Sequence, residues 1–352
     1  MKFSIQKHTL QKLLNEHNKV IPIRTTLPVL SCALFEIIKN TLLIRTTDLY
    51  QTIVSSTKIK DEKKVSSFIK DKFAKKVSTA VMEDLLQRKD DTFKVKNCEL
   101  SVFFSDLRDF TKISESINNP EKLIHLLNKY MDPMTKSIIE EKGTIDKFIG
   151  DAIMAYWNAP LPKTNHADAA VRAALKQLDS LKELNIRIKE EYNIELDIGI
   201  GINSGLCTVG EMGSTGRSDY TIIGDNVNLA SRVEGLTKYF GVKLIITEQT
   251  KKLLTQEYKI KELATVKVKG KNEPTILYEV LGFENKKSKH DLLYEEALSY
   301  YKQGNTTKAL NIFLILDKKE SSNLTQLYIN SCEKNLDNPS KNFTPIFDLD
   351  FK

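Results

Sequence analysis

The stretch Asp146-Lys-Phe-Ile-Gly-Asp-Ala-Ile-Met-Ala-Tyr-Trp157 decides how the central part of this chain folds. Around it, Thr144–Ile149 and Ile153–Trp157 are apolar runs with the length and composition of strands. They are separated by Gly150-Asp151, a dipeptide that suits a tight turn. The stretch therefore predicts a β-hairpin that carries the carboxylate of Asp151 at its tip.

A second carboxylate follows another short strand, in Ser101-Val-Phe-Phe-Ser-Asp-Leu-Arg-Asp-Phe-Thr111. The apolar strand Ser101–Ser105 ends at Asp106, and the chain then turns toward a helix. Backbone N–H groups at the start of a helix can hold phosphate oxygens. Two carboxylates beside a triphosphate suit Mg²⁺, which takes a few protein oxygens together with substrate phosphates. We therefore expect Asp106 and Asp151 to meet at a metal site.

The chain alternates strands and helices from Glu99 to about Phe283. Apolar spacing predicts helices over Glu121–Glu141, Ala167–Glu191 and Asn226–Phe240, and strands over Glu195–Asn203, Lys243–Ile246, Lys261–Lys269 and Thr275–Val280. This order predicts an α+β sandwich in which helices pack against one mainly antiparallel sheet.

The segment Tyr220-Thr-Ile-Ile-Gly-Asp-Asn-Val-Asn-Leu-Ala-Ser-Arg232 adds an amide and a guanidinium. Asn228 and Arg232 are four residues apart and therefore share one face of the predicted helix. Such a pair can orient a ribose and stabilise charge that builds on a transferring phosphorus. Further along, Val266-Lys-Val-Lys-Gly-Lys271 is a strand end that could bring a lysine to the triphosphate.

Each of these patterns has a commoner explanation when it is taken alone. An aspartate at the end of a strand is usually a turn or cap residue, and Gly150-Asp151 can be a plain hairpin turn. Asn228 with Arg232 can be a solvated helix face, and the glycines between residues 199 and 216 could serve turns. The joint occurrence of the patterns, in order and at workable spacing, favours the catalytic interpretation.

Together these motifs resemble the class III adenylate/guanylate cyclase domain, over about residues 65–283. The resemblance implies a ferredoxin-like sandwich, an antiparallel sheet covered by helices, with the catalytic domain at residues 98–283. It implies that Asp106 and Asp151 bind two Mg²⁺ (or Mn²⁺) ions, assisted by the backbone carbonyl of Leu107.

The family converts a nucleoside triphosphate into a cyclic nucleotide and pyrophosphate, by attack of the ribose 3′-hydroxyl on the α-phosphate. By resemblance, Asn228 would orient the ribose, Arg232 would stabilise the transition state and Lys269 would contact the triphosphate. In this family the metal aspartates come from one subunit and the base, ribose and arginine positions from the other. The resemblance therefore implies a head-to-tail homodimer with two equivalent sites.

Two positions read the base in this family. Lys147 stands four residues before Asp151, where adenylate cyclases carry lysine and guanylate cyclases an acidic residue. A lysine can donate to adenine N1, whereas the protonated N1 of guanine would leave it unpaired. Thr221 occupies the second position, where a hydroxyl can accept from the adenine amino group. The resemblance therefore implies ATP as the substrate and cyclic AMP as the product.

Asp109 departs from the family pattern, because a glycine is frequent at its position. An extra carboxylate beside the triphosphate loop would repel phosphate unless it points outward.

The overall composition, with 28% charged and 41% hydrophobic residues, is ordinary for a soluble globular protein. Four scattered cysteines without a CxxC pair argue against a disulfide framework and a zinc site, and they fit a reducing cytoplasm. No apolar run approaches the roughly 18 residues that a membrane span requires, and the N-terminus lacks a signal-peptide core. We therefore expect a soluble, cytoplasmic protein.

Residues 1–61 follow a different pattern. The segments MKFSIQKHTLQKLL, KVIPIRTTLPVLSCALFEI and NTLLIRTTDLYQTIV resemble the start of the bacterial DNA polymerase III β sliding clamp. They predict a small α+β fragment with a helix over Leu10–Val20 and a hairpin of Leu30–Ile38 with Thr41–Thr47. The resemblance covers about half of one clamp domain, which is too little to encircle DNA.

The net charge of +7 is concentrated at this end, since residues 1–97 carry 19 Lys and Arg against 10 Asp and Glu. A basic segment can bind nucleic acid or anionic lipid, although a solvated lysine-rich surface is the commoner explanation. A DNA-associated, sliding-clamp-related protein is therefore one alternative function, with weak nucleic-acid contact through basic residues such as Lys7, Lys12, Lys19 and Arg24.

Three further segments complete the chain. Residues 62–97, with KFAKKVSTAVMEDLL, look like the connector helix that precedes many bacterial cyclase domains. Residues 289–335 match a tetratricopeptide-like pattern of helical hairpins, too short for a free-standing solenoid and expected to dock on the preceding domain. Residues 336–352 are expected to form a poorly ordered tail. A non-catalytic signalling scaffold built on these helices is a second alternative, disfavoured because every matched catalytic position is intact.

The junction near Asp61–Lys64 joins two unrelated patterns. Family members with this connector and C-terminal pattern often have a membrane sensor upstream, where this chain has the clamp-like fragment. A gene fusion or an assembly error would produce such a junction.

Overall fold

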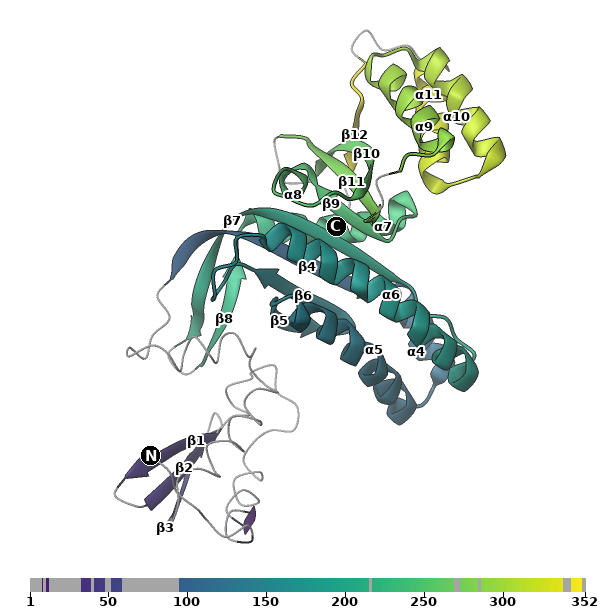
Figure 1. The fold of residues 1–352 in the computed structure, drawn as a ribbon. Helices are drawn as coiled ribbons and strands as arrows, with labels where there is room; N and C mark the ends of the chain where they lie inside the picture. Colours follow the sequence, from purple (N-terminus) through teal and green to yellow (C-terminus); the bar gives the residue numbers. More distant parts are fainter. Residues whose placement is uncertain are drawn as a thin grey trace. The chain divides into compact units, whose positions relative to one another are not determined.

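The structure is a computed structural model, and it describes residues 8, 11–12, 33–38, 41–47, 52–58, 95–214, 217–268, 273–283, 286–337 and 343–349. The chain divides into two compact units (Figure 1). One comprises Met1–Lys96 with Val209–Thr221, and the other comprises Asn97–Thr208 with Ile222–Lys352. The candidate catalytic carboxylates therefore lie in the second unit.

The N-terminal segment contains a three-stranded antiparallel sheet of β1 (Ala33–Ile38), β2 (Thr41–Thr47) and β3 (Thr52–Lys58). Ile38 pairs with Thr41, as the predicted hairpin requires, and Leu42 and Ile44 of β2 are fully buried. The helix predicted over Leu10–Val20 and the connector helix predicted at residues 62–97 lie almost entirely outside the described residues.

A sheet with the strand order β12-β10-β11-β9-β7-β4-β6-β5 makes up most of the second unit, and β8 (Arg217–Ile223), most of which belongs to the first unit, also pairs with β7. The strands are β4 (Lys96–Leu107), β5 (Thr144–Ile149), β6 (Ala152–Trp157), β7 (Ile198–Ser214), β9 (Leu244–Thr247), β10 (Lys259–Val268), β11 (Thr275–Gly282) and β12 (Ile346–Leu349). The pairs β7–β9 and β10–β12 are parallel, while β4–β6, β5–β6, β9–β11 and β10–β11 are antiparallel. These pairs are therefore mainly antiparallel, as the sequence predicted, and the two parallel pairs make the sheet mixed and not purely antiparallel.

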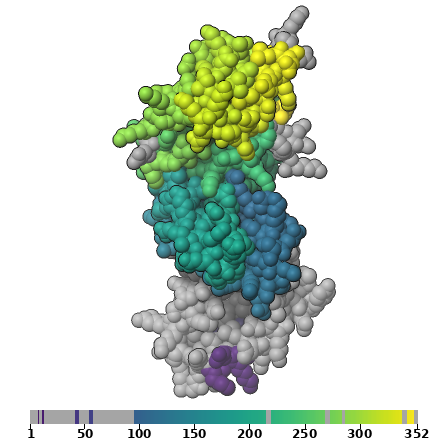
Figure 2. Space-filling model, turned by 90° about the vertical axis from the view of Figure 1, so that its right-hand side faces the viewer, coloured from purple at the N-terminus to yellow at the C-terminus, as the bar shows by residue number. Residues whose placement is uncertain are grey.

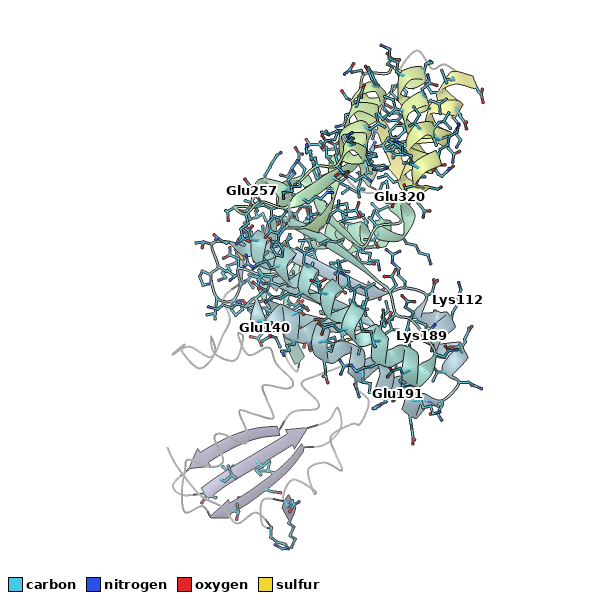
Figure 3. All side chains as sticks on the ribbon, turned by 45° about the vertical axis from the view of Figure 1, so that its right-hand side comes forward. Lys112, Glu140, Lys189, Glu191, Glu257 and Glu320 are labelled. Atoms are coloured by element: carbon cyan, nitrogen blue, oxygen red, sulfur yellow. The ribbon has the colours of Figure 1, made fainter. Side chains whose placement is uncertain are left out.

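Two long helices cover one face of this sheet, and they lie side by side (Figure 1, Figure 2). They are α5 (Pro120–Glu140) and α6 (His166–Tyr192), and the short α4 (Phe110–Ile117) precedes them. Their apolar stripes bury Tyr130 and Ile138 against Phe103 and Trp157 of the sheet. Charged side chains such as Lys189 lie on the outer side of α6 (Figure 3). This amphipathic pattern is what made both helices predictable.

The other face carries α7 (Asp225–Phe240) and three C-terminal helices, α9 (Lys289–Lys302), α10 (Thr306–Lys319) and α11 (Asn323–Asp337). The short α8 (Glu248–Lys252) follows β9. The hydroxyls of Tyr294 and Tyr328 donate to the carbonyl oxygens of Glu262 and Leu263 on β10, at 3.0 and 2.6 Å. The C-terminal helices thus share a core with the sheet, as the expected docking requires, while their tetratricopeptide-like character stays a prediction.

Part of the C-terminal segment is ordered, contrary to expectation. Ile346–Leu349 forms β12, which pairs in parallel with Thr265–Val268 of β10 at the edge of the sheet. The prediction of a poorly ordered tail is therefore wrong for these residues.

Among the described residues, no helix combines the length and the apolar character that crossing a bilayer demands.

Glycines in β7 allow α7 to lie unusually close to the sheet. A Cβ atom on Gly201 would stand 2.2 Å from the backbone nitrogen of Glu234, and one on Gly199 would stand 2.2 Å from Oγ1 of Thr237. Nonbonded carbon atoms in contact stand about 3.5 Å apart, so both distances would be severe clashes. These two glycines therefore serve helix packing inside a strand and not turns.

Candidate active site

Asp106 and Asp151 meet at one end of the central sheet. Asp106 is the penultimate residue of β4, and Asp151 follows Gly150 in the turn between β5 and β6. Because Ser105 pairs with Ile153, the register brings the end of β4 to the tip of the hairpin. Gly150 has φ +66°, a conformation that glycine adopts without strain. The predicted hairpin is confirmed, and Asp151 lies close enough to Asp106 for its charge to act on that carboxyl, while the metal role of the pair stays a prediction.

The carboxyl groups of Asp106 and Asp151 are close enough to interact directly. Burial, followed by the charge of Asp151, raises the pKa of Asp106 to about 7, and the backbone N–H of Leu107 opposes this rise by donating to the carboxylate. When two carboxyl groups are close together and no cation lies between them, the charge of one disfavours ionisation of the other. A divalent ion would remove that repulsion, so the pair suits a metal.

The described part of the chain holds no cluster of three or more His, Cys, Asp and Glu side chains arranged around a metal position. A site with two carboxylates is poor in protein ligands for zinc, which prefers four nitrogen or sulfur ligands. It matches Mg²⁺, which keeps waters and takes the remaining oxygens from substrate phosphates. The donor set therefore fits the predicted Mg²⁺ or Mn²⁺, with the carbonyl of Leu107 as a predicted third ligand.

A third carboxylate, Glu234 of α7, was not found from the sequence. Burial first, and then the charges of Asp106 and Asp151, raise its pKa to about 8, while Arg108 acts in the opposite direction. Its carboxylate lies over Gly199 and its backbone over Gly201. The only signal in the sequence was the pair of glycines, which open the space that this side chain occupies.

Arg108 ties the loop after β4 to its surroundings. Its guanidinium donates to the carbonyl oxygen of Val242 at 2.5 Å and forms an ion pair with Asp197 at 3.6 Å. Its backbone N–H also donates to the carbonyl oxygen of Asp197 at 2.8 Å. These bonds fix the direction in which the chain leaves Asp106.

Asp109 begins α4 and has a left-handed backbone, with φ 53° and ψ 29°. Its carboxylate lies 3.1 Å from Nζ of Lys238 on α7 and 3.5 Å from Nζ of Lys112 on α4. The hydrogen bond from Lys238, followed by the charge of Lys112, lowers the pKa of Asp109. The additional acid is therefore ionised and paired with two lysines.

Comparison with known proteins agrees with this geometry. The family model for the adenylate and guanylate cyclase catalytic domain matches residues 93–282, just over half of the chain. The chain belongs to this family. The model for the N-terminal domain of the DNA polymerase III β subunit matches residues 1–114, about a third of the chain, and overlaps the cyclase match. For the N-terminal segment, the similarity to the sliding clamp therefore remains a resemblance.

Several curated relatives carry adenylate cyclase names. Adenylate cyclase 1 of Rhizobium meliloti is 35% identical over 184 residues, which are 52% of this chain and 28% of the relative. Adenylate cyclase of Anabaena cylindrica is 37% identical over 192 residues, or 51% of this chain and 36% of that protein. The chain thus spans about a third, or less, of the length of these relatives.

Solved structures with the same domain include cyclases of both substrate classes. The adenylyl cyclase CyaB from P. aeruginosa is 35% identical with a TM-score of 0.50, covering 56% of this chain and 98% of that one. The guanylyl cyclase Cya2 is 31% identical with a TM-score of 0.50, covering 54% and 94%. Overall similarity therefore identifies a cyclase domain without distinguishing ATP from GTP.

Two of the remaining predicted residues, Lys147 and Thr221, lie on strands of the sheet. Lys147 is exposed on β5, with Nζ 3.2 Å from Asp146. Thr221 lies buried on β8, in the unit with the N-terminal segment, and Lys269 is outside the described residues. The structure therefore leaves their base and phosphate contacts as predictions.

Asn228 and Arg232 lie on α7, as predicted, with Asn228 exposed and Arg232 half-buried. An α-helix turns by about 100° per residue, so Arg232 and Glu234 point roughly 160° apart. Glu234 faces the sheet and the carboxylate pair of its own chain. Asn228 and Arg232 consequently present a different side of the helix.

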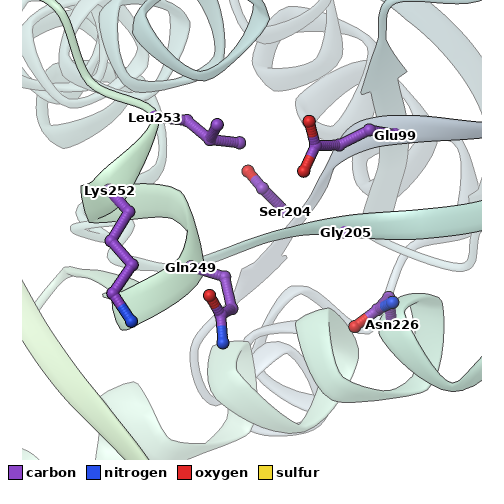
Figure 4. Close-up of a pocket in the computed structure, with 7 residues that line it drawn as sticks. All are labelled: Glu99, Ser204, Gly205, Asn226, Gln249, Lys252 and Leu253. Carbon is purple, nitrogen blue, oxygen red and sulfur yellow. The ribbon is translucent and has the colours of Figure 1, made fainter.

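A separate cavity lies at the opposite end of β4 (Figure 4). Its volume is about 280 Å³, and it is lined by Glu99, Ser204, Gly205, Asn226, Gln249, Lys252 and Leu253. Glu99 precedes Asp106 by seven residues, which corresponds to about 23 Å along an extended strand. This cavity is therefore not part of the cyclase carboxylate site.

Proposed function

We propose that this chain is an adenylate cyclase that converts ATP into cyclic AMP and pyrophosphate. The observation that carries the proposal is the strand register that brings Asp106, at the end of β4, to Asp151 at the hairpin tip, beside the start of α4. The bond from the ribose 3′-oxygen to the α-phosphorus forms, and the bond from that phosphorus to the oxygen bridging to the β-phosphate breaks. The 3′-hydroxyl proton is released with the products.

The carboxylates of Asp106 and Asp151, with the carbonyl of Leu107, would hold two Mg²⁺ or Mn²⁺ ions. Such ions, when bound, activate the 3′-hydroxyl and neutralise charge on the phosphates. The N–H groups at the start of α4 are placed to receive phosphate oxygens, because they have no partners within the helix. Asp106 and Asp151 are half-buried, and partial removal from water strengthens electrostatic contacts of this kind.

We propose further that the site is completed by a second copy of the chain. In this arrangement Asn228 orients the ribose, Arg232 stabilises charge on the transferring phosphorus and Lys269 contacts the triphosphate. The orientation of α7 supports a site in a partner, because Asn228 and Arg232 point away from the side that Glu234 directs toward the chain's own carboxylates. A head-to-tail homodimer then contains two equivalent sites.

Lys147 and Thr221 are the residues that favour ATP over GTP as the proposed substrate. The ammonium of Lys147 is exposed on the hairpin that carries Asp151, and Asp146 is its ion-pair partner. An ammonium can donate to adenine N1 but finds only a donor at guanine N1. The adenylate cyclase names of the curated relatives support this choice, while the similarity to the guanylyl cyclase Cya2 makes it worth testing.

The test uses the full chain with MgATP or MgGTP, and cyclic nucleotides are measured by mass spectrometry. We expect cyclic AMP from ATP, and we expect Asp151→Asn to lower its formation at least about a thousandfold, because the metal pair is lost. Lys147→Glu should reduce the use of ATP more than the use of GTP. Lys182→Glu is the control, because Lys182 is an exposed lysine of α6 paired only with Asp179.

Full activity of Asp151→Asn would refute the proposed metal site. Equal losses for both nucleotides in Lys147→Glu would refute the proposed reading of the base.

A further inference from the structure

Asp109 stands where the resemblance makes a glycine frequent, and the structure shows what its side chain contacts. It stands three residues after Asp106, and its carboxylate lies between Nζ of Lys238 at 3.1 Å and Nζ of Lys112 at 3.5 Å. Lys238 comes from α7 and Lys112 from the first turn of α4. Lys112 is labelled at the exposed end of the second unit in Figure 3. The carboxylate thus joins two elements at the edge of the carboxylate site.

The same place is where the proposed function puts the triphosphate. The start of α4 presents unpaired backbone N–H groups and the positive end of the helix dipole. Asp109 does not use these groups, because its side chain makes no capping hydrogen bond to α4. Its carboxylate instead forms ion pairs with Lys238 and Lys112. A phosphate bound at the helix start would compete with Asp109 for the same two ammonium groups.

We propose that Asp109 acts as an internal competitor of the nucleotide triphosphate, holding Lys238 and Lys112 until phosphate oxygens replace its carboxylate. This inference rests on the proposed function, since it concerns the affinity of that site for its substrate. Asp109 is a positioning residue in this role. It sets how tightly the triphosphate binds and leaves the chemical step to Asp106 and Asp151.

The high exposure of Asp109, Lys238 and Lys112 makes such an exchange feasible. Their side chains are 47%, 70% and 80% exposed for Asp109, Lys238 and Lys112. Ion pairs this exposed are weak and readily exchanged. A triphosphate carries several negative charges and Asp109 carries one, so a bound triphosphate displaces the carboxylate of Asp109 from the two lysines. The residual competition corresponds to about a two- to fivefold change in affinity.

Asp109→Asn isolates the charge from the backbone. Asparagine tolerates the left-handed conformation as well as aspartate does, so the turn into α4 is preserved. We expect this variant to lower the KM for MgATP about two- to fivefold with little change in kcat, and to unfold at an unchanged temperature. Titration calorimetry with inorganic tripolyphosphate and Mg²⁺ should show the same gain in affinity without any turnover.

Asp179→Asn is the matched control. Asp179 and Lys182 form a more exposed pair at 2.9 Å on α6, and they have no contact with the carboxylate site among the described interactions. This variant should leave both KM and tripolyphosphate binding unchanged.

A double-mutant cycle separates exchange of lysines from simple repulsion between Asp109 and phosphate. Lys238→Gln should raise the KM, and in that background Asp109→Asn should lose at least half of its effect. Direct repulsion predicts an undiminished or larger effect once the lysine is gone. An undiminished effect, or an unchanged KM and tripolyphosphate affinity in Asp109→Asn, would overturn the inference.

The two proposals fail in different ways. If the chain forms no cyclic nucleotide but Asp109→Asn still binds tripolyphosphate more tightly, the inference about the lysines stands and the proposed reaction does not. If the chain forms cyclic AMP and Asp109→Asn matches the parent in every measurement, the reaction stands and the inference is refuted.

Discussion

Gly201→Ala tests the contact that holds α7 against the sheet. The added Cβ would lie 2.2 Å from the nitrogen and 2.6 Å from the Cα of Glu234, and 2.7 Å from the carbonyl oxygen of Ala230. All three atoms belong to the backbone of α7, so no side-chain rotation relieves the clash. Carbon atoms in contact stand about 3.5 Å apart, so α7 or β7 must move by about 1 Å.

The expected cost follows from that displacement. Extra atoms forced into a packed core usually destabilise a protein by about 1–3 kcal/mol, and we expect the upper end here because backbone atoms must move. A misplacement of about 1 Å at catalytic groups can lower the rate about a hundredfold. Because α7 also carries Asn228 and Arg232, cyclic AMP formation should fall by about this factor even where the variant remains folded.

Gly235→Ala provides the control on the same helix. Its added Cβ meets nothing within 4 Å, so it introduces no clash. Alanine in place of glycine within a helix should stabilise the protein by about 0.5–1 kcal/mol. Urea midpoints and initial rates of cyclic AMP formation would be compared for both variants and the parent. If the free energy of unfolding of Gly201→Ala lies within about 0.5 kcal/mol of that of the parent, as for a neutral surface change, the close approach of α7 to the sheet is refuted.

Two further predictions concern pH and the C-terminal helices. With divalent ions chelated, the urea midpoint should fall as pH rises from about 4 to about 8, because Asp106 and Glu234 bind protons more tightly in the folded chain than in the unfolded one. A flat midpoint over this range would contradict the raised pKa values. Tyr328→Phe should destabilise the chain by about 0.5–1.5 kcal/mol in the same assay, since it removes the 2.6 Å hydrogen bond to the carbonyl of Leu263 while the hydroxyl of Tyr294 still lies 3.3 Å from that oxygen. A midpoint equal to that of the parent would show that the helices do not depend on this bond.

Elements with a strong local pattern were predictable from the sequence. β5 has the predicted bounds Thr144–Ile149, and α5 begins at Pro120, one residue before the prediction. Proline at the first helical position, with Asn119 accepting from the backbone N–H of Lys122, marks that start locally. The meeting of Asp106 with Asp151 was also predictable, because a hairpin and a neighbouring strand fix it.

Elements whose conformation depends on distant partners were not predictable. β7 was expected to end at Asn203, before a glycine-rich segment, yet it continues to Ser214 and pairs with β8. Pairing within a sheet overrides the local preference of glycine for turns. β12 is likewise a strand only because β10 offers an edge. The neighbours of Glu234 gave no sign that glycines on another strand would make room for its carboxylate.

The close contact of α7 with β7 also determines the acid strengths at the site. Burial is the largest cause of the raised pKa of both Asp106 and Glu234, and the contact of α7 with Gly199 and Gly201 holds Glu234 against the sheet. A helix displaced by about 1 Å would admit water, and water lowers the pKa of a buried carboxyl group toward its ordinary value. The Gly201→Ala variant should therefore lose part of the pH dependence of stability as well as stability itself. A variant that is destabilised but keeps the full pH dependence would show that the like charges of the three carboxylates, and not their burial, raise the pKa values.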